Sequence, residues 1–118
     1  MSAPINARAS RDQLRARVFR ALADETRLAL VGRLASGQRY SIAQLTQDTA
    51  LTRQAVTKHL RVLERVRLVH STRTGRESLF ELDPRPIADM KDYLDLVSRR
   101  WDSALNRLKA FVESDVGG

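Results

Sequence analysis

The sequence predicts a mainly α-helical fold with a small β-hairpin, a winged helix-turn-helix whose elements follow the order ααααββα. Three observations predict it: a basic helix after the good N-cap Thr52, two strand-like runs around a glycine, and a long C-terminal segment with a heptad repeat. A chain of 118 residues can bury one core but not two. We therefore expect a flexible N-terminal arm over residues 1–10 and one domain over residues 11–118.

The first two helices are predicted from apolar residues at helical spacing. The first begins near Arg11, and its apolar face comprises Leu14, Val18, Phe19 and Leu22. The second is capped by Asp24 and stopped by Gly37. Its expected buried stripe is Leu28, Val31, Leu34 and Ala35.

The next two helices are short and separated by a turn over residues 48–51. Ser41 is expected to cap the third helix, with Ile42 and Leu45 facing inward. Thr52 caps the fourth, whose expected buried face is Ala55, Val56, Leu60 and Leu63. Two such helices, the second with an exposed polar and basic face, make a helix-turn-helix in which the second helix reads DNA.

The wing is predicted directly after this recognition helix. Residues 68–72 and 77–82 have strand character, and the Thr74-Gly75 pair supplies the reversal between them. Pro84 and Pro86 end the second strand, because proline has no N–H to donate to a ladder. Residues 51–76 hold seven basic side chains and one acidic one, a net +6 out of the whole chain's +7. Clustered positive charge indicates a polyanionic partner.

The C-terminal segment, about residues 87–114, is predicted to be one long helix with a seam of apolar residues. So small a domain cannot easily bury a stripe of four heptads, so we expect a homodimer interface that the first helix shares. The predicted interface positions are Leu14, Val18, Ile87, Met90, Leu94, Val97, Trp101, Ala104, Leu108 and Phe111. Trp101 has a second interpretation, as an aromatic wall of an effector pocket.

With these elements the chain resembles the ArsR family of bacterial winged helix-turn-helix repressors. The resemblance runs through residues 21–37, 52–69 and 72–84, with the last helix agreeing in place and length more than in sequence. It implies a homodimer that binds a partly palindromic operator, represses transcription and releases DNA when an effector binds.

Three departures from the family pattern concern sensing and the wing. Metal-sensing members carry a cysteine pair at the start of the third helix, where this chain has residues 41–46, SIAQLT. The last helix has no histidine, so no metal and no cofactor are expected. The family's small residue and glycine between recognition helix and wing are replaced by Val66 and Arg67, and a left-handed non-glycine residue costs roughly 1–2 kcal/mol.

The candidate DNA contacts divide by chemistry. Glutamine can read adenine, arginine guanine and threonine the thymine methyl group, so Gln54 and Thr57 with Arg53 are the base-reading candidates. Phosphate or minor-groove contacts are expected from Lys58, Arg61, Arg73 and Arg76, with Ser41, Gln44, Thr52 and His59 completing the predicted set. For the helix residues the alternative is an ordinary solvated face, and for His59 a packed, hydrogen-bonded histidine.

Composition excludes several classes of function. The chain has no cysteine and two histidines, so neither thiolate metal sites, disulfides nor a catalytic triad are expected. It lacks a Gly-rich phosphate loop after a strand, and we expect no enzyme. No segment approaches the roughly 20 apolar residues of a membrane span, so a cytoplasmic protein is expected. The expected partners are double-stranded DNA, a second copy and a possible small-molecule effector; the alternative is a winged-helix module that binds an acidic protein.

Overall fold

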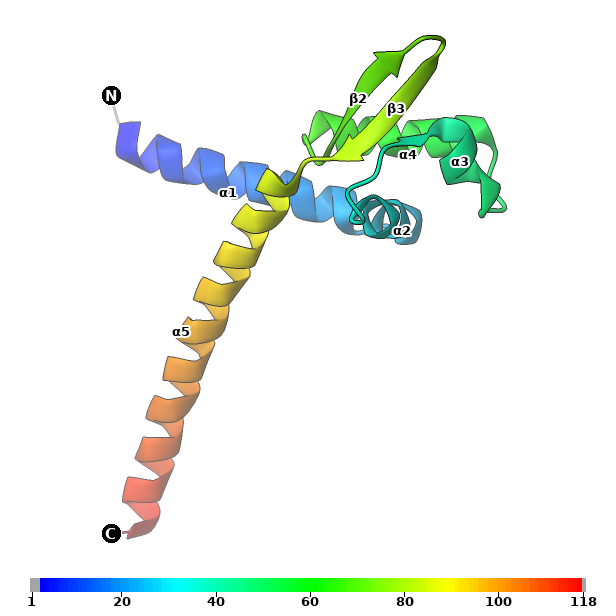
Figure 1. The fold of residues 1–118 in the computed structure, drawn as a ribbon. Helices are drawn as coiled ribbons and strands as arrows, with labels where there is room; N and C mark the ends of the chain where they lie inside the picture. The colour runs from blue at the N-terminus through cyan, green and yellow to red at the C-terminus, as the bar shows by residue number, and fades with distance from the viewer. Residues whose placement is uncertain (1–2, 118) are drawn as a thin grey trace. The chain divides into compact units, whose positions relative to one another are not determined.

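The computed structural model describes the backbone of residues 3–117 and the side chains of residues 10–114. The chain divides into two units, one ending at Pro86 and one beginning at Ile87. Its elements are α1 (Ala3–Leu22), α2 (Glu25–Leu34), β1 (Tyr40–Ser41), α3 (Ile42–Gln47), α4 (Arg53–Arg65), β2 (Val69–Thr74), β3 (Glu77–Leu82) and α5 (Pro84–Gly117) (Figure 1). The predicted fold class is confirmed, with one strand more than expected.

The predicted N-terminal boundary was wrong. Helix α1 begins at Ala3, so the backbone of residues 3–10 is helical where a flexible arm was expected. Residues 1 and 2 of that arm lie outside the described residues. Pro4 suits the first turn of a helix, which needs no N–H from it, and Ala7 and Ala9 are strong helix formers. Small size and a proline were misread as signs of a disordered arm.

Helix α2 confirms its predicted cap and corrects its predicted buried face. The Asp24 side chain accepts a hydrogen bond of 3.0 Å from the backbone N–H of Arg27. Leu30, Val31 and Leu34 are buried, whereas Leu28 is 57% exposed. A three-residue step turns a helix by about 300°, so a stripe counted in threes drifts around the helix and leaves the face that packs on α4 and β3.

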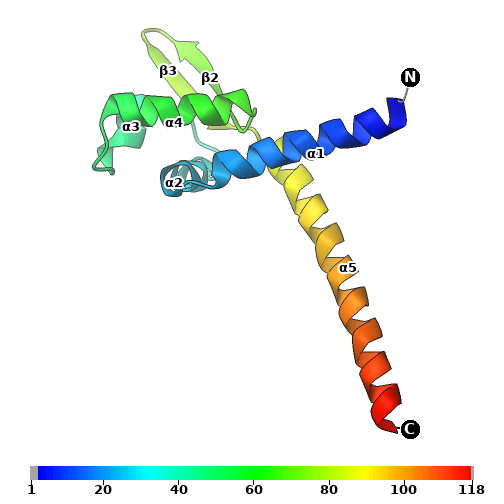
Figure 2. The ribbon, with the colours of Figure 1, turned by 180° about the vertical axis from the view of Figure 1, so that it is seen from behind.

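Both caps of the helix-turn-helix are as predicted. Ser41 and Gln44 form a capping box: the Ser41 Oγ accepts from the Gln44 N–H at 3.2 Å, and the Gln44 Oε1 accepts from the Ser41 N–H at 2.9 Å. The Thr52 Oγ1 accepts from the Ala55 N–H at 3.1 Å. Helices α3 and α4 pack together on either side of the turn, as Figure 2 shows from behind.

The wing is part of a three-stranded antiparallel sheet in the order β1-β3-β2. The hairpin pairs Val69 with Leu82 at its base and Thr74 with Glu77 at its tip, where Gly75 has a φ of 63°. Strand β1 was not predicted, because two residues are too few to show alternation. Its Tyr40 pairs with Phe80, which is fully buried.

The junction between α4 and the wing is a Schellman motif. Arg67 has a φ of 63°, and its N–H donates to the carbonyl of Glu64 at 3.0 Å. The Leu68 N–H donates to the carbonyl of Leu63, also at 3.0 Å. The left-handed position is thus occupied by arginine, and the buried Leu63 and Leu68 supply the apolar contact that accompanies this motif.

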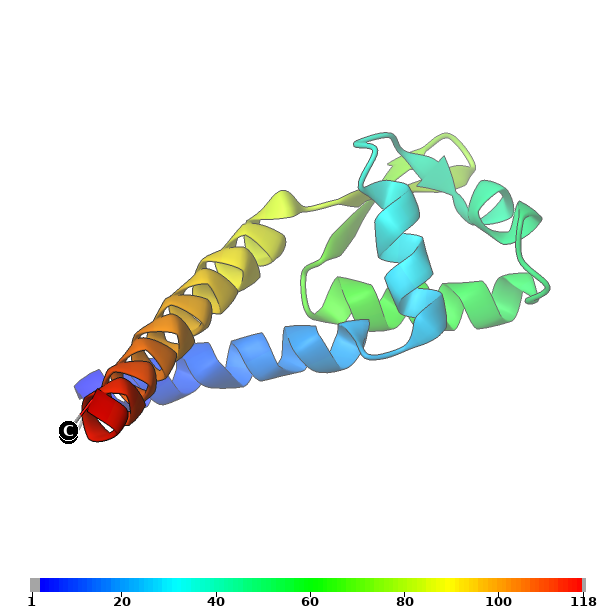
Figure 3. The same ribbon diagram turned by 90° about the horizontal axis from the view of Figure 1, so that it is seen from below.

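The core of the first unit joins α4 to the elements around it. Figure 3 shows α2 crossing α4, and α2 also packs on β3. The fully buried large side chains are Leu34, Leu45, Val56, Leu60, Leu63, Leu68 and Phe80, and Val69 is only 2% exposed. Helices α2, α3 and α4 and strands β2 and β3 contribute to this core, so the recognition helix is held from several sides.

Helix α5 begins at Pro84, slightly earlier than the predicted start at residue 87, and ends at Gly117. Pro84 fits the first turn, and the Asp83 Oδ1 accepts from the Arg85 N–H at 3.0 Å, which caps the turn. None of the helices in the described part of the chain combines the length and apolar character that a membrane span requires.

Candidate nucleic-acid interface

The outer face of α4 carries the predicted base-reading residues. Arg53 and Gln54 are exposed on its first turn, and Thr57 is half-buried one turn later. The Thr57 Oγ1 donates to the Arg53 carbonyl at 2.7 Å, which leaves the methyl group as its surface for an apolar contact. Within the described residues, no hydrogen bond or ion pair engages the side chain of Gln54 or Lys58, so both remain available to a ligand.

Arg61 belongs to a small network that ties α4 to the wing. Its Nη1 lies 2.8 Å from the Glu64 Oε1, and the Glu64 Oε2 accepts from the Ser71 hydroxyl at 3.0 Å. Arg61 therefore has a carboxylate partner, but its side chain is still 54% exposed. An exposed pair of this kind contributes little to stability and can exchange its partner for a phosphate.

The three capping residues are less free than the sequence suggested. Ser41 is buried and closes the capping box, so its side chain offers little to DNA. Gln44 uses its oxygen in that box, and its amide nitrogen remains a donor on an exposed residue. A hollow of about 390 Å³ lies beside it, lined by Gln44, Thr46 and Arg53 among others. The Thr52 hydroxyl accepts the first-turn bond and can still donate its hydrogen outward.

His59 takes the packed position rather than the outward one. Its Nδ1 lies 3.3 Å from the Arg27 Nη1 and 3.7 Å from the Asp24 Oδ2, at the start of α2. The backbone hydrogen bond from Arg27, together with the positive charge of Arg27, lowers the pKa of Asp24. His59 thus anchors α4 to the cap of α2, and the proposed DNA surface does not include it.

The wing presents its two predicted arginines near the tip. Arg73 lies opposite Ser78 in the hairpin, and Arg76 follows Gly75 in the turn; both are exposed. At the base of the sheet, the Glu81 Oε2 lies 2.9 Å from the Arg39 Nε and 3.8 Å from the His70 Nε2. In the part of the chain that the structure describes, no group of three His, Asp or Glu side chains could hold a metal ion.

The predicted interface positions differ in exposure. On α1, Leu14 is 57% exposed, whereas Val18 is buried at 8% and has little surface for a second copy. On α5, Leu94, Trp101, Leu108 and Phe111 are exposed, and Ile87, Val97 and Ala104 are half-buried. Met90 is buried at 7% and, like Val18, has little surface for a second copy. Sequence reasoning missed Leu105 and Val112, which are 55% and 50% exposed. Their spacing of seven was the available signal, since it widens the stripe by a third series.

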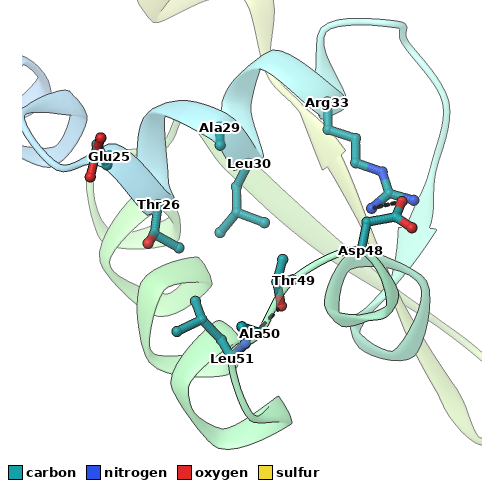
Figure 4. A pocket seen from close by; sticks show the side chains of 9 residues that line it. All are labelled: Glu25, Thr26, Ala29, Leu30, Arg33, Asp48, Thr49, Ala50 and Leu51. Carbon is teal, nitrogen blue, oxygen red and sulfur yellow. Dashed lines mark hydrogen bonds and ion pairs between the residues drawn. The ribbon is translucent and has the colours of Figure 1, made fainter.

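A groove of about 420 Å³ lies between α2 and the turn of the helix-turn-helix. Figure 4 shows Thr26 and Leu30 of α2 on one side and Thr49 and Leu51 of the turn on the other. At one end the Arg33 Nη1 lies 3.1 Å from the Asp48 Oδ2. The Thr49 hydroxyl donates to the Thr46 carbonyl and accepts from the Leu51 N–H. The Thr49 side chain therefore stabilises the turn before α4.

The chain is similar to known proteins in both sequence and fold. A family model described as a helix-turn-helix domain matches residues 22–72. The HTH-type transcriptional regulator Rv2034 of Mycobacterium tuberculosis is 37% identical over 99 residues, covering 84% of this chain and 89% of that protein. Among solved structures, the ArsR-like transcriptional regulator from Rhodococcus sp. RHA1 is similar with a TM-score of 0.76 and 29% identity, over 86% of this chain and 95% of that one.

A second solved structure shares the fold at lower identity. It is the homodimeric winged helix-turn-helix DNA-binding domain Mb0332 from Mycobacterium bovis, described as a possible ArsR-family regulator. Its TM-score is 0.63 at 22% identity, over 77% of this chain and 83% of that chain. The relatives are transcriptional regulators rather than enzymes. With its capped α3 and α4, its wing and these relatives, the chain belongs to the ArsR family of winged helix-turn-helix transcriptional regulators.

Proposed function

We propose that this regulator is a repressor that binds a partly palindromic operator as a homodimer in the cytoplasm. The observation that carries the proposal is the exposed first turn of α4, where Arg53 and Gln54 stand beside a surface with a net charge of +6 over residues 51–76. A helix of this kind enters the major groove with its N-terminal residues against base edges.

Each contact has a separate role in this proposal. Gln54 would accept from and donate to adenine, Arg53 would donate to guanine, and the Thr57 methyl group would pack on thymine. Phosphates would be bound by Lys58, Arg61, Arg73 and Arg76, helped by the Thr52 hydroxyl and the Gln44 amide. The phosphate contacts position the protein, and the base contacts choose the sequence.

The second copy would dock on the seam of α5. Leu94 is 52% exposed, Leu108 59% and Phe111 71%, which is a large apolar surface for a single chain. The missed Leu105 and Val112 would extend this surface along α5, and Leu14 of α1 would be a further contact of the second copy. The homodimeric state of Mb0332 supports the pairing of two copies. Two recognition helices related by a twofold axis would meet half-sites about 10 base pairs apart, or a multiple of that.

The test is the binding of labelled duplexes by fluorescence anisotropy at fixed salt. The first duplex carries an inverted repeat from the DNA that flanks the gene, and the second carries the same bases in random order. The wild-type protein should prefer the repeat, and Gln54→Ala should weaken binding to it by about 1–3 kcal/mol with little change on random DNA. Gln13→Ala, an exposed glutamine on α1, is the matched control.

Equal affinity of the wild-type protein for both duplexes would contradict sequence-specific repression. Tight binding of an acidic protein by α4, without a preference for any duplex, would favour the protein-binding alternative. A second readout is transcription from a promoter that carries the repeat, because a repressor lowers the transcript level when it occupies the site.

A further inference from the structure

A pocket lined by arginines lies at the C-terminal end of α4. It has a volume of about 420 Å³ and is formed by α1, the first turn of α2 and the last turn of α4. Four of its lining residues are Arg17, Arg20, Arg27 and Arg65, and none is acidic. Figure 3 shows α1 leading into α2 next to α4, and both α1 and α2 contact α4.

Arg27 interacts with the nearby Asp24 carboxylate, whose pKa it lowers, but the other three arginines of the pocket differ. None of the ion pairs within residues 10–114 uses Arg17, Arg20 or Arg65. Arg27 is held in place, because its Nε donates to the Ala21 carbonyl and its Nη1 lies 3.3 Å from the His59 Nδ1. Four guanidinium groups around one hollow repel each other, and an anion between them would relieve that repulsion.

The pocket is separate from the base-reading residues. Arg65 comes eleven positions after Gln54 on α4. At a rise of 1.5 Å per residue, this places the two about 16 Å apart along the helix axis. The remaining lining residues are Ala21, Val62 and Val66, so the pocket also has an apolar wall.

We propose that this pocket binds a small anion that carries several negative charges on phosphate or carboxylate groups and has an apolar part. Guanidinium groups bind such oxygens with two parallel hydrogen bonds, which a lysine cannot do. The apolar wall would accept the uncharged portion of the ligand. Since the arginines come from α1, α2 and α4, the ligand bridges three helices.

The anion would act as the effector of the regulator, and this part rests on the proposed function. Binding would pull the end of α4 toward α1, which carries the exposed Leu14 of the proposed dimer surface. A change in that distance alters the spacing of the two recognition helices. A ligand that binds the two spacings with different affinity shifts the balance between operator-bound and free protein.

The first experiment measures anion binding to the full chain without DNA. Adenosine triphosphate and inorganic tripolyphosphate serve as probes in isothermal titration calorimetry at constant ionic strength. The wild-type protein should bind both, and adenosine triphosphate more tightly because of its apolar part. Arg20→Ala with Arg65→Ala should weaken binding at least tenfold. Arg11→Ala with Arg99→Ala, two exposed arginines outside the pocket, has the same net charge and should bind as the wild type does.

Circular dichroism checks that each variant is folded, and Arg65→Gln alone serves if the double variant is not. Equal binding by the pocket variants and the control would overturn the proposal, since the probes would then bind elsewhere. Absence of binding to the wild-type protein would overturn it too.

The second experiment separates a free anion from the phosphates of DNA. If the pocket holds the duplex backbone instead, the pocket variant loses affinity for every duplex while neither probe binds the wild type, and the proposal is wrong. Operator binding in the absence of any probe tests the proposed repressor function by itself. If the protein does not bind the operator, the calorimetry still shows whether the pocket binds an anion. The repressor proposal and the anion proposal can therefore fail separately.

Discussion

Helices α4 and α5 both carry an apolar stripe, but the stripe of α4 is buried and much of the stripe of α5 is exposed. On α4, Val56, Leu60 and Leu63 are 0% exposed. On α5, Trp101 is 64% exposed and Phe111 71%. The same kind of pattern is therefore satisfied inside one chain in the first case and left uncovered within the chain in the second.

The difference has a geometric cause. Helix α4 has 13 residues, and its stripe packs on α2, α3 and β2 within one compact unit. Helix α5 has 34 residues, which corresponds to about 50 Å of helix, and its seam repeats every seven residues. The position of the reading surface thus depends on one chain, whereas the proposed pairing of two reading surfaces depends on a second copy.

Breaking the stripe of α4 should have the largest effect on stability. Leu60→Ala leaves a cavity in a fully buried site and should lower the free energy of unfolding by about 2–5 kcal/mol. Urea unfolding followed by circular dichroism measures it. Leu28→Ala removes the same atoms at a position that is 57% exposed and should change the value by less than about 0.5 kcal/mol. Similar losses in both variants would contradict the burial difference.

Breaking the stripe of α5 should act on assembly instead. In Trp101→Glu a carboxylate would be buried against the partner without a counterion, which costs free energy of association. A cost of about 3 kcal/mol raises the dimer dissociation constant about 100-fold. Sedimentation velocity over a range of protein concentrations measures it. Ser103→Glu adds the same charge at an exposed position outside the seam and should leave the dimer intact. A monomeric wild-type protein at micromolar concentration would refute the proposed interface.

Removing the wing arginines tests whether the wing contacts DNA beside the reading surface of α4. Arg73→Ala with Arg76→Ala should weaken binding to operator and random duplex equally, because phosphate contacts carry little base information. The slope of log affinity against log salt should become less steep by about 2 if each arginine binds one phosphate. The control is again Arg11→Ala with Arg99→Ala. An unchanged slope would mean that the wing does not reach DNA.

The smallest expected effect concerns Asp83, which stands between β3 and α5. Hydrogen bonds from the Arg85 side chain and backbone lower the pKa of Asp83 to about 2 from an ordinary value of 3.8. Because the folded value is the lower one, the ionised form stabilises the fold above about pH 4, and this contribution is lost as the pH falls toward 2. Asp83→Asn should therefore lower the melting temperature at pH 7 and converge with the wild type near pH 2.

Asp102→Asn, an exposed carboxylate on α5, is the control for that comparison. It should differ little from the wild type at any pH. A melting-temperature difference for Asp83→Asn that stays constant from pH 7 to pH 2 would show that ionisation of this carboxyl group is not what stabilises the junction.

The sequence by itself determined the elements whose signals lie within a few residues. The Thr52 cap predicted the start of α4, the run from Glu77 to Leu82 predicted β3, and Gly37 predicted the end of α2. The replacement of glycine by Arg67 led us to expect a different entry to the wing, but the structure keeps the left-handed turn with arginine in it. These signals are local because a cap or a turn is a hydrogen bond between neighbours in the chain.

Only the tertiary structure decided which residues meet across the chain. The exposure of Leu28, the pairing of β1 with β3 and the packing of His59 on Asp24 each depend on where another element lies. The arginine pocket has the same origin, since its arginines are up to 48 positions apart, from Arg17 to Arg65. No periodicity within one segment encodes such a meeting, because it is set by how the helices pack around Leu34, Leu60 and Phe80.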